Sequence, residues 1–141
     1  MMRTAKIGIK NQDYENYLMI QRDGNLQTIY RKKWDVVGGV ILPNETALEA
    51  VMRENKEETG GIGIFDIVSL GEITAFDCIK GNMVPTLVHL FLGKTHARID
   101  NIKTEKDQKA GYFSLDGIMK LDTLPNLKEL VKKYRRTLER F

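Results

Sequence analysis

The sequence holds very few of the residues that build disulfides or zinc sites. Its 141 residues include one cysteine, Cys78, and two histidines, His89 and His96. A single cysteine excludes an internal disulfide, so we expect a reduced, cytoplasmic setting. Thiol and imidazole side chains at such wide spacing give no zinc pattern. His89 lies in an apolar, strand-like run and is expected in the core, whereas His96 is expected at the surface.

Long apolar segments are also missing. No run approaches the roughly 20 apolar residues that a membrane-spanning helix needs, so we expect no membrane partner. The opening residues, Met1 to Lys6, lack the apolar core of a secretion signal. The chain has instead 42% hydrophobic and 29% charged residues, which is typical of an ordered globular protein. Its length suits one domain, so we predict a single domain over residues 1–141.

The net charge of +3 is concentrated at the C-terminal end. From Asn126 to Phe141, six basic residues face two acidic ones, while the rest of the chain is nearly neutral. Such a segment can attract a polyanion such as a nucleic acid. It can equally be the solvated face of a helix, and we favour this interpretation. A nucleic-acid partner is therefore not expected.

Hydrophobic periodicity predicts strands interleaved with two main helices. The predicted strands cover residues 5–10, 17–22, 34–40, 64–76, 84–94 and 112–115. Turn signals lie at 11–13, 23–25 and 80–82, and a polar surface loop is predicted over 101–109. Helices are predicted over 46–59 and from about 125 to the C-terminus. This order predicts an α/β (α+β) fold with a mixed sheet sandwiched between helices.

The helix over 46–59 carries three acidic residues on one side. Glu54, Glu57 and Glu58 share an arc of about 100° on a helical wheel. The adjoining sector is apolar and is expected to pack, with Leu48, Val51 and Met52 among its members. We expect Asn44 or Glu45 at the start of the helix and Gly60 at its end.

Three clustered carboxylates repel one another, and near the C-terminal end of a helix they also oppose its dipole. A hard divalent cation would explain the placement, because Mg²⁺ prefers oxygen ligands and also binds phosphates. The alternative is a solvated acidic face with Arg53 and Lys56 nearby. The three glutamates alone favour this alternative.

The spacing of the residues around the three glutamates favours the metal site over the solvated face. Seven positions match the pattern known as the Nudix box: Gly39, Glu45, Arg53, Glu54, Glu57, Glu58 and Gly60. The sequence therefore resembles the Nudix hydrolase family, specifically over residues 39–60 and loosely over most of the chain. The approach through Trp34 to the glycine pair and the late aromatic stretch over 112–118 also resemble the family.

The resemblance implies a Nudix-type α/β/α sandwich and a role for each residue of the box. Glu54, Glu57 and Glu58 would bind metal, and the carbonyl of Gly38 would be a further ligand. Arg53 would hold a glutamate in place through a charge-assisted pair. One of the acids would act as the catalytic base. The metal would be Mg²⁺, with Mn²⁺ as a substitute.

Three positions depart from the family pattern without removing a metal ligand. Asn55 and Gly61 replace aliphatic residues of the box, and Val37 replaces the proline usual before the glycine pair. Asn55 is expected to be buried, so its amide is expected to be hydrogen-bonded within the protein.

Four further residues are candidates for substrate binding. Glu105 and Asp107 lie in the polar loop where many family members carry an additional acid. Arg22 ends the second predicted strand, and Trp34 could stack on a base. The alternatives are solvent-facing charges in the loop and a packing role for Trp34.

The resemblance implies Mg²⁺-dependent hydrolysis of a phosphoanhydride bond in a nucleoside-diphosphate-linked compound. ADP-ribose-specific members tend to carry a proline past the box, and dinucleoside-polyphosphate-specific members a tyrosine. Residues 62–84 contain neither, which favours a nucleoside triphosphate, including noncanonical ones, over a nucleotide sugar. The alternative is a non-catalytic Nudix fold that binds nucleotide or RNA, but such a module would not need all three acids. The sequence also allows a homodimer.

Overall fold

The structure is a computed structural model that describes residues 1–22, 32–79 and 82–141. The turn predicted at 23–25, and two of the three residues of the turn at 80–82, lie outside these ranges. The first strand, β1 (Met2–Asn11), is the axis of the fold. Its side chains alternate: Ala5, Ile7 and Ile9 are buried on one face of the sheet, and Lys6 and Lys10 lie on the other.

Strand β1 pairs along its whole length on one side and with two successive partners on the other. It runs parallel to β6 (Asn82–Thr95) from Met2 to Asn11. Its first half is antiparallel to β4 (Val37–Val40), and Lys10 pairs with the start of β2 (Tyr17–Gln21). The sheet therefore divides beside β1, with β2 and β4 on separate branches.

The remaining strands extend this mixed sheet. The long β5 (Phe65–Ile79) is antiparallel to β6, with irregular register around Ser69 and Gly71. Strand β2 also pairs with β3 (Trp34–Asp35) and with β7 (Lys109–Phe113). One strand was predicted over 34–40, and the structure has two, because Val36 lies between the β3 pairing with β2 and the β4 pairing with β1.

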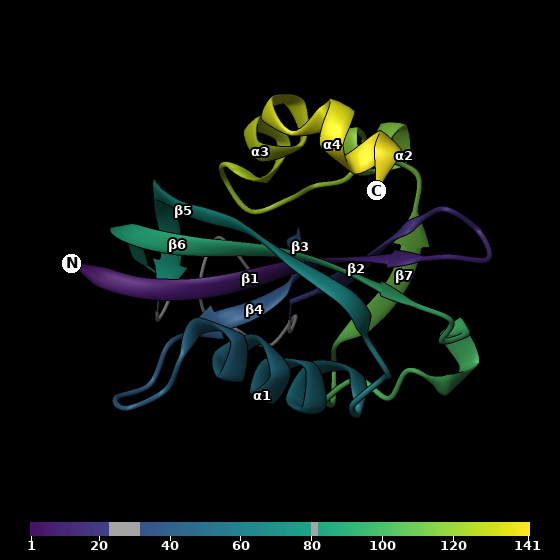
Figure 1. The fold of residues 1–141 in the computed structure, drawn as a ribbon, viewed down its shortest axis with the longest axis horizontal. Coiled ribbons are helices and arrows are strands. Elements are labelled where there is room, and N and C mark those ends of the chain that lie inside the picture. The colour runs from purple at the N-terminus through teal and green to yellow at the C-terminus, as the bar shows by residue number, and fades with distance from the viewer. Residues whose placement is uncertain (23–31, 80–81) are drawn as a thin grey trace.

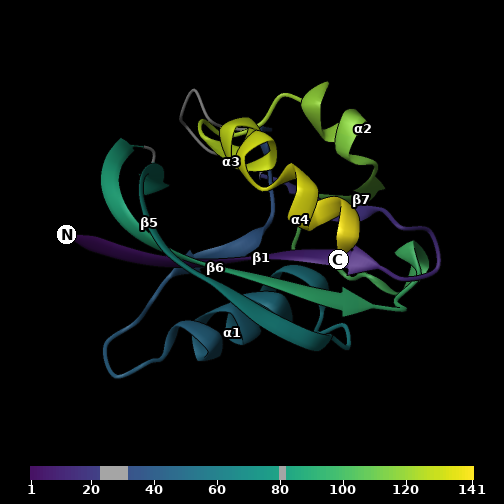
Figure 2. The same cartoon turned by 45° about the horizontal axis from the view of Figure 1, so that its top comes forward.

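Helices cover both faces of the sheet (Figures 1 and 2). Helix α1 (Ala47–Thr59) lies on one face, over a core that includes Ile7, Val37 and Val51. The other face is covered by three short helices: α2 (Leu115–Met119), α3 (Leu127–Lys133) and α4 (Arg135–Arg140). A short 3₁₀ turn, η1 (Ile99–Asn101), precedes the polar loop. The α+β architecture with a mixed sheet between helices is confirmed.

The C-terminal helix differs from the prediction. A continuous helix was expected from about residue 125, but Tyr134 leaves helical geometry at φ −101° and ψ 13°, and the segment forms α3 and α4. The apolar stripe survives the break, since Leu127, Val131 and Leu138 are all buried. Within the described ranges no helix is long and apolar enough to cross a membrane.

Candidate active site

Helix α1 begins and ends at well-defined caps. Thr46 accepts a hydrogen bond from the Glu49 N–H, and the Glu49 carboxylate accepts one from the Thr46 N–H. This reciprocal pair satisfies two of the free amides of the first turn. The expectation of Asn44 or Glu45 as the cap was wrong by one or two residues. The end was correct: Gly60 adopts φ 82°, a conformation that favours glycine.

The helical wheel predicted the buried side of α1 only in part: Val51 and Asn55 are buried as expected, but two of the apolar residues are not. Leu48 and Met52 are 44% and 38% exposed, whereas Asn55 and Thr59 are buried with Val51. Because Glu58 follows Val51 by seven residues, it projects from the same inward side. The three acids therefore differ in environment: the side chain of Glu54 is 16% exposed, while that of Glu57 is 49% exposed.

Asn55 links the helix to the chain that follows it. Its amide nitrogen donates to the Ile62 carbonyl at 2.9 Å, and its amide oxygen lies 2.8 Å from the Thr59 hydroxyl. The side chain is buried and hydrogen-bonded at both ends, as predicted. This contact fixes the last turn of α1, which carries Glu57 and Glu58.

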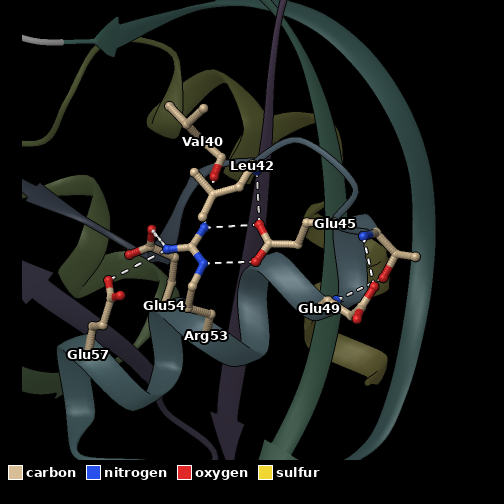
Figure 3. A network of polar contacts seen from close by, with 8 residues as sticks. Val40, Leu42, Glu45, Glu49, Arg53, Glu54 and Glu57 are labelled. Atoms are coloured by element: carbon tan, nitrogen blue, oxygen red, sulfur yellow. Dashed lines mark hydrogen bonds and ion pairs between the residues drawn. The ribbon is translucent and has the colours of Figure 1, made fainter.

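Arg53 lies between the acids of the helix and the loop before it (Figure 3). Its guanidinium donates to both carboxylate oxygens of Glu45, at 2.8 and 3.1 Å, and to the Val40 carbonyl at 2.9 Å. On the other side it donates to Glu54 at 2.9 Å and lies 3.6 Å from Glu57. These hydrogen bonds raise the pKa of Arg53 and lower the pKa of Glu45. Arg53 thus positions a metal-binding candidate and the preceding loop together.

The glycine pair in β4 lets the helix approach the sheet. The Gly38 N–H donates to the Glu58 carboxylate at 3.1 Å. A side chain at Gly39 would overlap the Glu54 carboxyl group, and one at Gly38 would overlap the backbone of β1 at Ala5. Both positions therefore need glycine for space, because neither has a positive φ.

The inward carboxyl groups resist ionisation. Burial, with smaller contributions from Glu54 and Asp35, raises the pKa of Glu58 to about 8. The Gly38 amide and Arg22 only partly oppose this shift. Burial also raises the pKa of Glu54, against the effect of its hydrogen bond from Arg53. Two neighbouring buried carboxyl groups would gain stability from a bound cation.

A polar cavity of about 680 Å³ opens over these groups. Its described lining comes from β1 to β4, α1, β5 and the polar loop, and includes Gly38, Glu54, Glu57, Glu58, Arg22 and Glu105. The structure thus brings together the three metal-binding candidates of α1 and two of the four substrate-binding candidates. Arg53 lies behind the acids, outside the described lining.

The two other candidates do not line the cavity. Trp34 packs edge-on against Phe113, with ring centroids 5.2 Å apart, on the side of the C-terminal helices. Asp107 lies elsewhere in the polar loop, at a positive φ of 66°. His89 is only partly buried, at 23% exposure, and is hydrogen-bonded to Ser69 rather than enclosed in the core. His96 is 64% exposed, as expected.

The cavity also contains an ionic group that sequence reasoning missed. The Lys6 ammonium lies 2.8 Å from Asp35 and 3.3 Å from Asp77, and all three side chains are about 90% buried. Burial lowers the pKa of Lys6, but the two aspartates outweigh it and raise the pKa to about 12. A signal was present: each of these charges interrupts an apolar strand segment, in Ala5-Lys6-Ile7, Trp34-Asp35-Val36 and Phe76-Asp77-Cys78.

The donor set fits a hard divalent cation. Glu54, Glu57 and Glu58 offer carboxylate oxygens, and the close packing at Gly39 leaves the Glu54 carboxyl group at the cavity wall. In the ranges that the structure describes, no three acidic, histidine or cysteine side chains are already gathered around one point. The Arg53 guanidinium lies 2.9 Å from Glu54 and 3.6 Å from Glu57, so a bound cation would share these two carboxylates with it.

A mixed sheet between helices, with a capped acidic helix beside a glycine pair, is the setting in which the residues of the Nudix box lie. The chain belongs to the Nudix family: the sequence model of the NUDIX domain matches residues 2–141. It is therefore a Nudix hydrolase, an enzyme of the nucleotide pyrophosphohydrolase type. Members of this family generally use divalent metal ions. No match was found among curated protein sequences.

Solved structures agree with this assignment. The MutT protein from Methanosarcina mazei Go1 is 26% identical, with a TM-score of 0.74 over 96% of this chain and 94% of that one. An Ap4A hydrolase from C. elegans is 20% identical, with a TM-score of 0.74 over the whole of both chains. The NUDIX domain of Shewanella oneidensis NrtR, solved with ADP ribose, is 13% identical, with a TM-score of 0.75 over 98% of this chain and 88% of that one. The last two similarities concern the fold alone.

Proposed function

We propose that this enzyme hydrolyses a phosphoanhydride bond of nucleoside triphosphates, including noncanonical ones, with Mg²⁺ held by Glu54, Glu57, Glu58 and the Gly38 carbonyl. The observation that supports this is the position of the three acids and the glycine pair on one polar cavity, beside Arg22 and Glu105. Its volume of about 680 Å³ lies in the range of small-molecule sites.

The residues of the site would have different roles in this reaction. Bound Mg²⁺ would supply neutralisation of the phosphate charge and a water of lowered pKa. Arg53 keeps Glu54 in place and ties it to the loop before the helix. Arg22 would contact a phosphate oxygen. Glu57, Glu58 or Glu105 would accept the proton of the attacking water, since a general base must lie within hydrogen-bond reach of it.

A panel assay tests the proposal. Nucleoside triphosphates, ADP ribose and Ap4A are incubated with the enzyme and Mg²⁺, and released phosphate, pyrophosphate and nucleotides are separated by chromatography. We expect Mg²⁺-dependent cleavage that is highest for a triphosphate. The variant with Glu54, Glu57 and Glu58 all changed to Gln is the control. Hydrolysis by this variant at the wild-type rate would contradict the assignment.

Metal binding has a separate readout. Mg²⁺ that binds the native state adds RT ln(1 + [L]/Kd) to its stability. We expect Mg²⁺ to raise the melting temperature of the wild type but not of the triple Gln variant. An equal rise in both proteins would place the metal elsewhere.

The alternative of an RNA-binding module depends on the basic C-terminal segment. Lys132, Lys133, Arg136 and Arg140 are exposed, which agrees with a solvated helix face. Reversing Lys132, Lys133, Arg135 and Arg136 to Glu should leave hydrolysis of free nucleotides nearly unchanged. Tight RNA binding by the wild type that weakens steeply with salt, and is lost in the reversed variant, would favour the alternative. A cytoplasmic location and a homodimer stay predictions; light scattering tests the latter.

A further inference from the structure

In the part of the chain that the structure describes, three buried side-chain polar atoms lack a hydrogen-bond partner, and all three belong to residues that line the cavity. Among the described residues, the side-chain atoms without a partner are the Thr4 hydroxyl, the Arg22 Nε and the Gln108 amide oxygen. Burying an unpaired polar group costs free energy, so such atoms are rare unless a ligand pairs with them. They come from three different parts of the wall: β1, the end of β2 and the loop before β7.

Thr4 is the clearest of the three. It is fully buried on β1, two residues before Lys6, so both side chains project from the same face of the strand. A threonine on the neighbouring strand provides a comparison. Thr86, on β6, is equally buried, but its hydroxyl donates to the Ala75 carbonyl at 3.1 Å. The missing partner at Thr4 is therefore specific to the cavity and is not a property of buried threonines in this sheet.

The charged group beside Thr4 sets the chemistry of this part of the cavity. Lys6, Asp35 and Asp77 together carry one net negative charge, and all three line the cavity. Asp35 also lies close enough to Glu58 to affect its ionisation, so this group borders the metal-binding acids. A net negative wall repels further phosphate groups. It favours a neutral group that presents N–H donors to the carboxylates and an acceptor to the lysine.

The remaining wall is aliphatic. The described lining contains Met2, Ile20, Val36 and Val40 but no aromatic side chain. A flat heterocycle would pack its face against these aliphatic groups, and discrimination would come from hydrogen bonds along its edge. Guanine, adenine and cytosine each carry an exocyclic amine on that edge, and guanine also carries the O6 acceptor.

We propose that Thr4, Lys6, Asp35 and Asp77 form a base-reading wall that selects nucleotides whose base carries an exocyclic amine. This inference rests on the proposed function, because it assigns the base end of the same substrate. The two carboxylates accept from the amine, the lysine donates to a neighbouring ring acceptor or carbonyl, and the Thr4 hydroxyl gains the partner that the protein does not supply. Arg22 then faces the phosphates.

Matched nucleotide pairs test the wall directly. GTP and ITP differ only in the exocyclic amine, and CTP carries an amine where UTP carries a carbonyl. We expect kcat/KM to favour GTP over ITP, and CTP over UTP, by about tenfold or more, because a buried polar group left unpaired in the complex costs at least this factor. The Asp77→Asn variant keeps the size of the side chain but loses its charge, so its GTP preference should shrink. Equal kcat/KM values within both pairs in the wild type would overturn the proposal.

The Thr4→Val variant tests whether the Thr4 hydroxyl binds the substrate or has only a structural role. Valine keeps the shape of threonine and removes the unpaired hydroxyl, so the melting temperature should rise while kcat/KM for GTP falls about tenfold. The control is Thr86→Val, which removes a paired hydroxyl: its melting temperature should fall while the GTP to ITP ratio stays at the wild-type value. Unchanged kcat/KM in Thr4→Val would show that this hydroxyl does not contact the substrate, and would overturn its place in the wall.

Binding measurements distinguish a failure of this inference from a failure of the proposed function. Titration calorimetry of the Glu57→Gln variant, whose turnover should be strongly reduced, measures how tightly GTP and ITP bind. If the wild type hydrolyses no triphosphate but GTP still binds about tenfold more tightly than ITP, the proposed reaction is wrong and the proposed base selection is supported. If the wild type hydrolyses triphosphates but GTP and ITP bind equally, the proposed reaction is supported and the proposed base selection is wrong.

Discussion

The two faces of the sheet are covered by helices that are held in different ways. Helix α1 is capped at both ends and fastened by named polar contacts: Arg53 to Glu45 and Val40, Asn55 to Ile62, and Glu58 to Gly38. The opposite face is covered by three helices of five to seven residues, whose contacts are mainly apolar. An apolar cavity of about 70 Å³ remains among Met19, Leu92 and Val131 on that side.

This difference matches what each face has to do. Hydrogen bonds between buried polar groups define one geometry, because a partner lost is not replaced by water. Apolar contacts tolerate small shifts as long as volume is filled. The α1 face places the proposed catalytic acids and needs one geometry, whereas the apolar contacts opposite close the core. We therefore expect changes to the polar contacts of α1 to have large and specific effects, and changes to the apolar contacts under α2 to α4 to have small ones.

The largest effect is expected at the acids of α1. Glu57→Gln and Glu58→Gln should each lower kcat by about 100-fold or more, if these residues bind metal or accept the proton. Their stabilities should differ: without metal, Glu58→Gln should raise the melting temperature clearly, because its carboxyl group is buried, and Glu57→Gln only slightly. Glu129→Gln, at a 75% exposed position on α3, is the control for both kinetics and melting. Wild-type turnover in either α1 variant would contradict the assignment.

The pH dependence of stability should also trace to the α1 face. The pKa of Glu58 is about 8 in the native protein, against 4.5 ordinarily. The native state thus binds more protons than the unfolded state between these values, so stability should fall as pH rises through this window. The loss should be a few kcal/mol, at about 1.4 kcal/mol per pKa unit.

Denaturation curves between pH 4.5 and 8, in the presence of EDTA, measure this loss. Glu54, Asp35 and Arg22 face the same carboxyl group and set the midpoint with it. The Glu58→Gln variant should show a flatter profile, and Mg²⁺ should restore most stability at the alkaline end, since ligands must be deprotonated to bind metal. A stability that rises with pH across the window in the wild type would refute the buried, protonated Glu58.

A smaller effect is expected at Asn55. Leucine would fit the aliphatic pattern of the box but would leave the Ile62 carbonyl and the Thr59 hydroxyl without their partners. Asn55→Leu should therefore cost about 1–3 kcal/mol in chemical denaturation. Activity should fall little, because the acids keep their own contacts. A gain in stability would show that this amide is dispensable and that the α1 face tolerates change as the opposite face does.

The smallest effect is expected on the opposite face. Val131→Ile adds one methylene group beside the apolar cavity and should raise stability by about 0.5–1 kcal/mol. Hydrolysis rates should stay at the wild-type level. A loss of more than about 1 kcal/mol would indicate that this side is as tightly packed as the α1 face, since overpacking has that cost.

Local sequence signals predicted much of the fold. The alternation around Ile7 and Ile9, the apolar run from Tyr17 and the glycine after Thr59 located β1, β2 and the end of α1. The start of α1 was misplaced because Asn44 and Thr46 are both common caps. Only the Thr46 to Glu49 spacing, which forms the reciprocal pair, distinguishes them.

Tertiary contacts account for what was missed. A helical wheel shows which residues share a side but not how far the sheet covers that side, so Leu48 and Met52 were expected to be buried and are exposed. The group formed by Lys6, Asp35 and Asp77 unites three strands that are far apart in sequence, and no local pattern joins them. The break at Tyr134 likewise follows from packing, because the apolar stripe runs through it without interruption.

The long parallel pairing of β1 with β6 has a consequence for the order of folding during synthesis. Strand β1 leaves the ribosome long before its partner along Thr86 to Thr95, since about 75 residues separate the two segments. Until then, one edge of β1 is unpaired, and the cavity wall that includes Thr4 and Lys6 cannot form. Contacts between distant segments also slow folding, because the intervening chain must first be ordered. We therefore expect a nascent chain that ends before β6 to be protease-sensitive and dependent on chaperones, whereas one that extends past Thr95 can complete the pairing of β1.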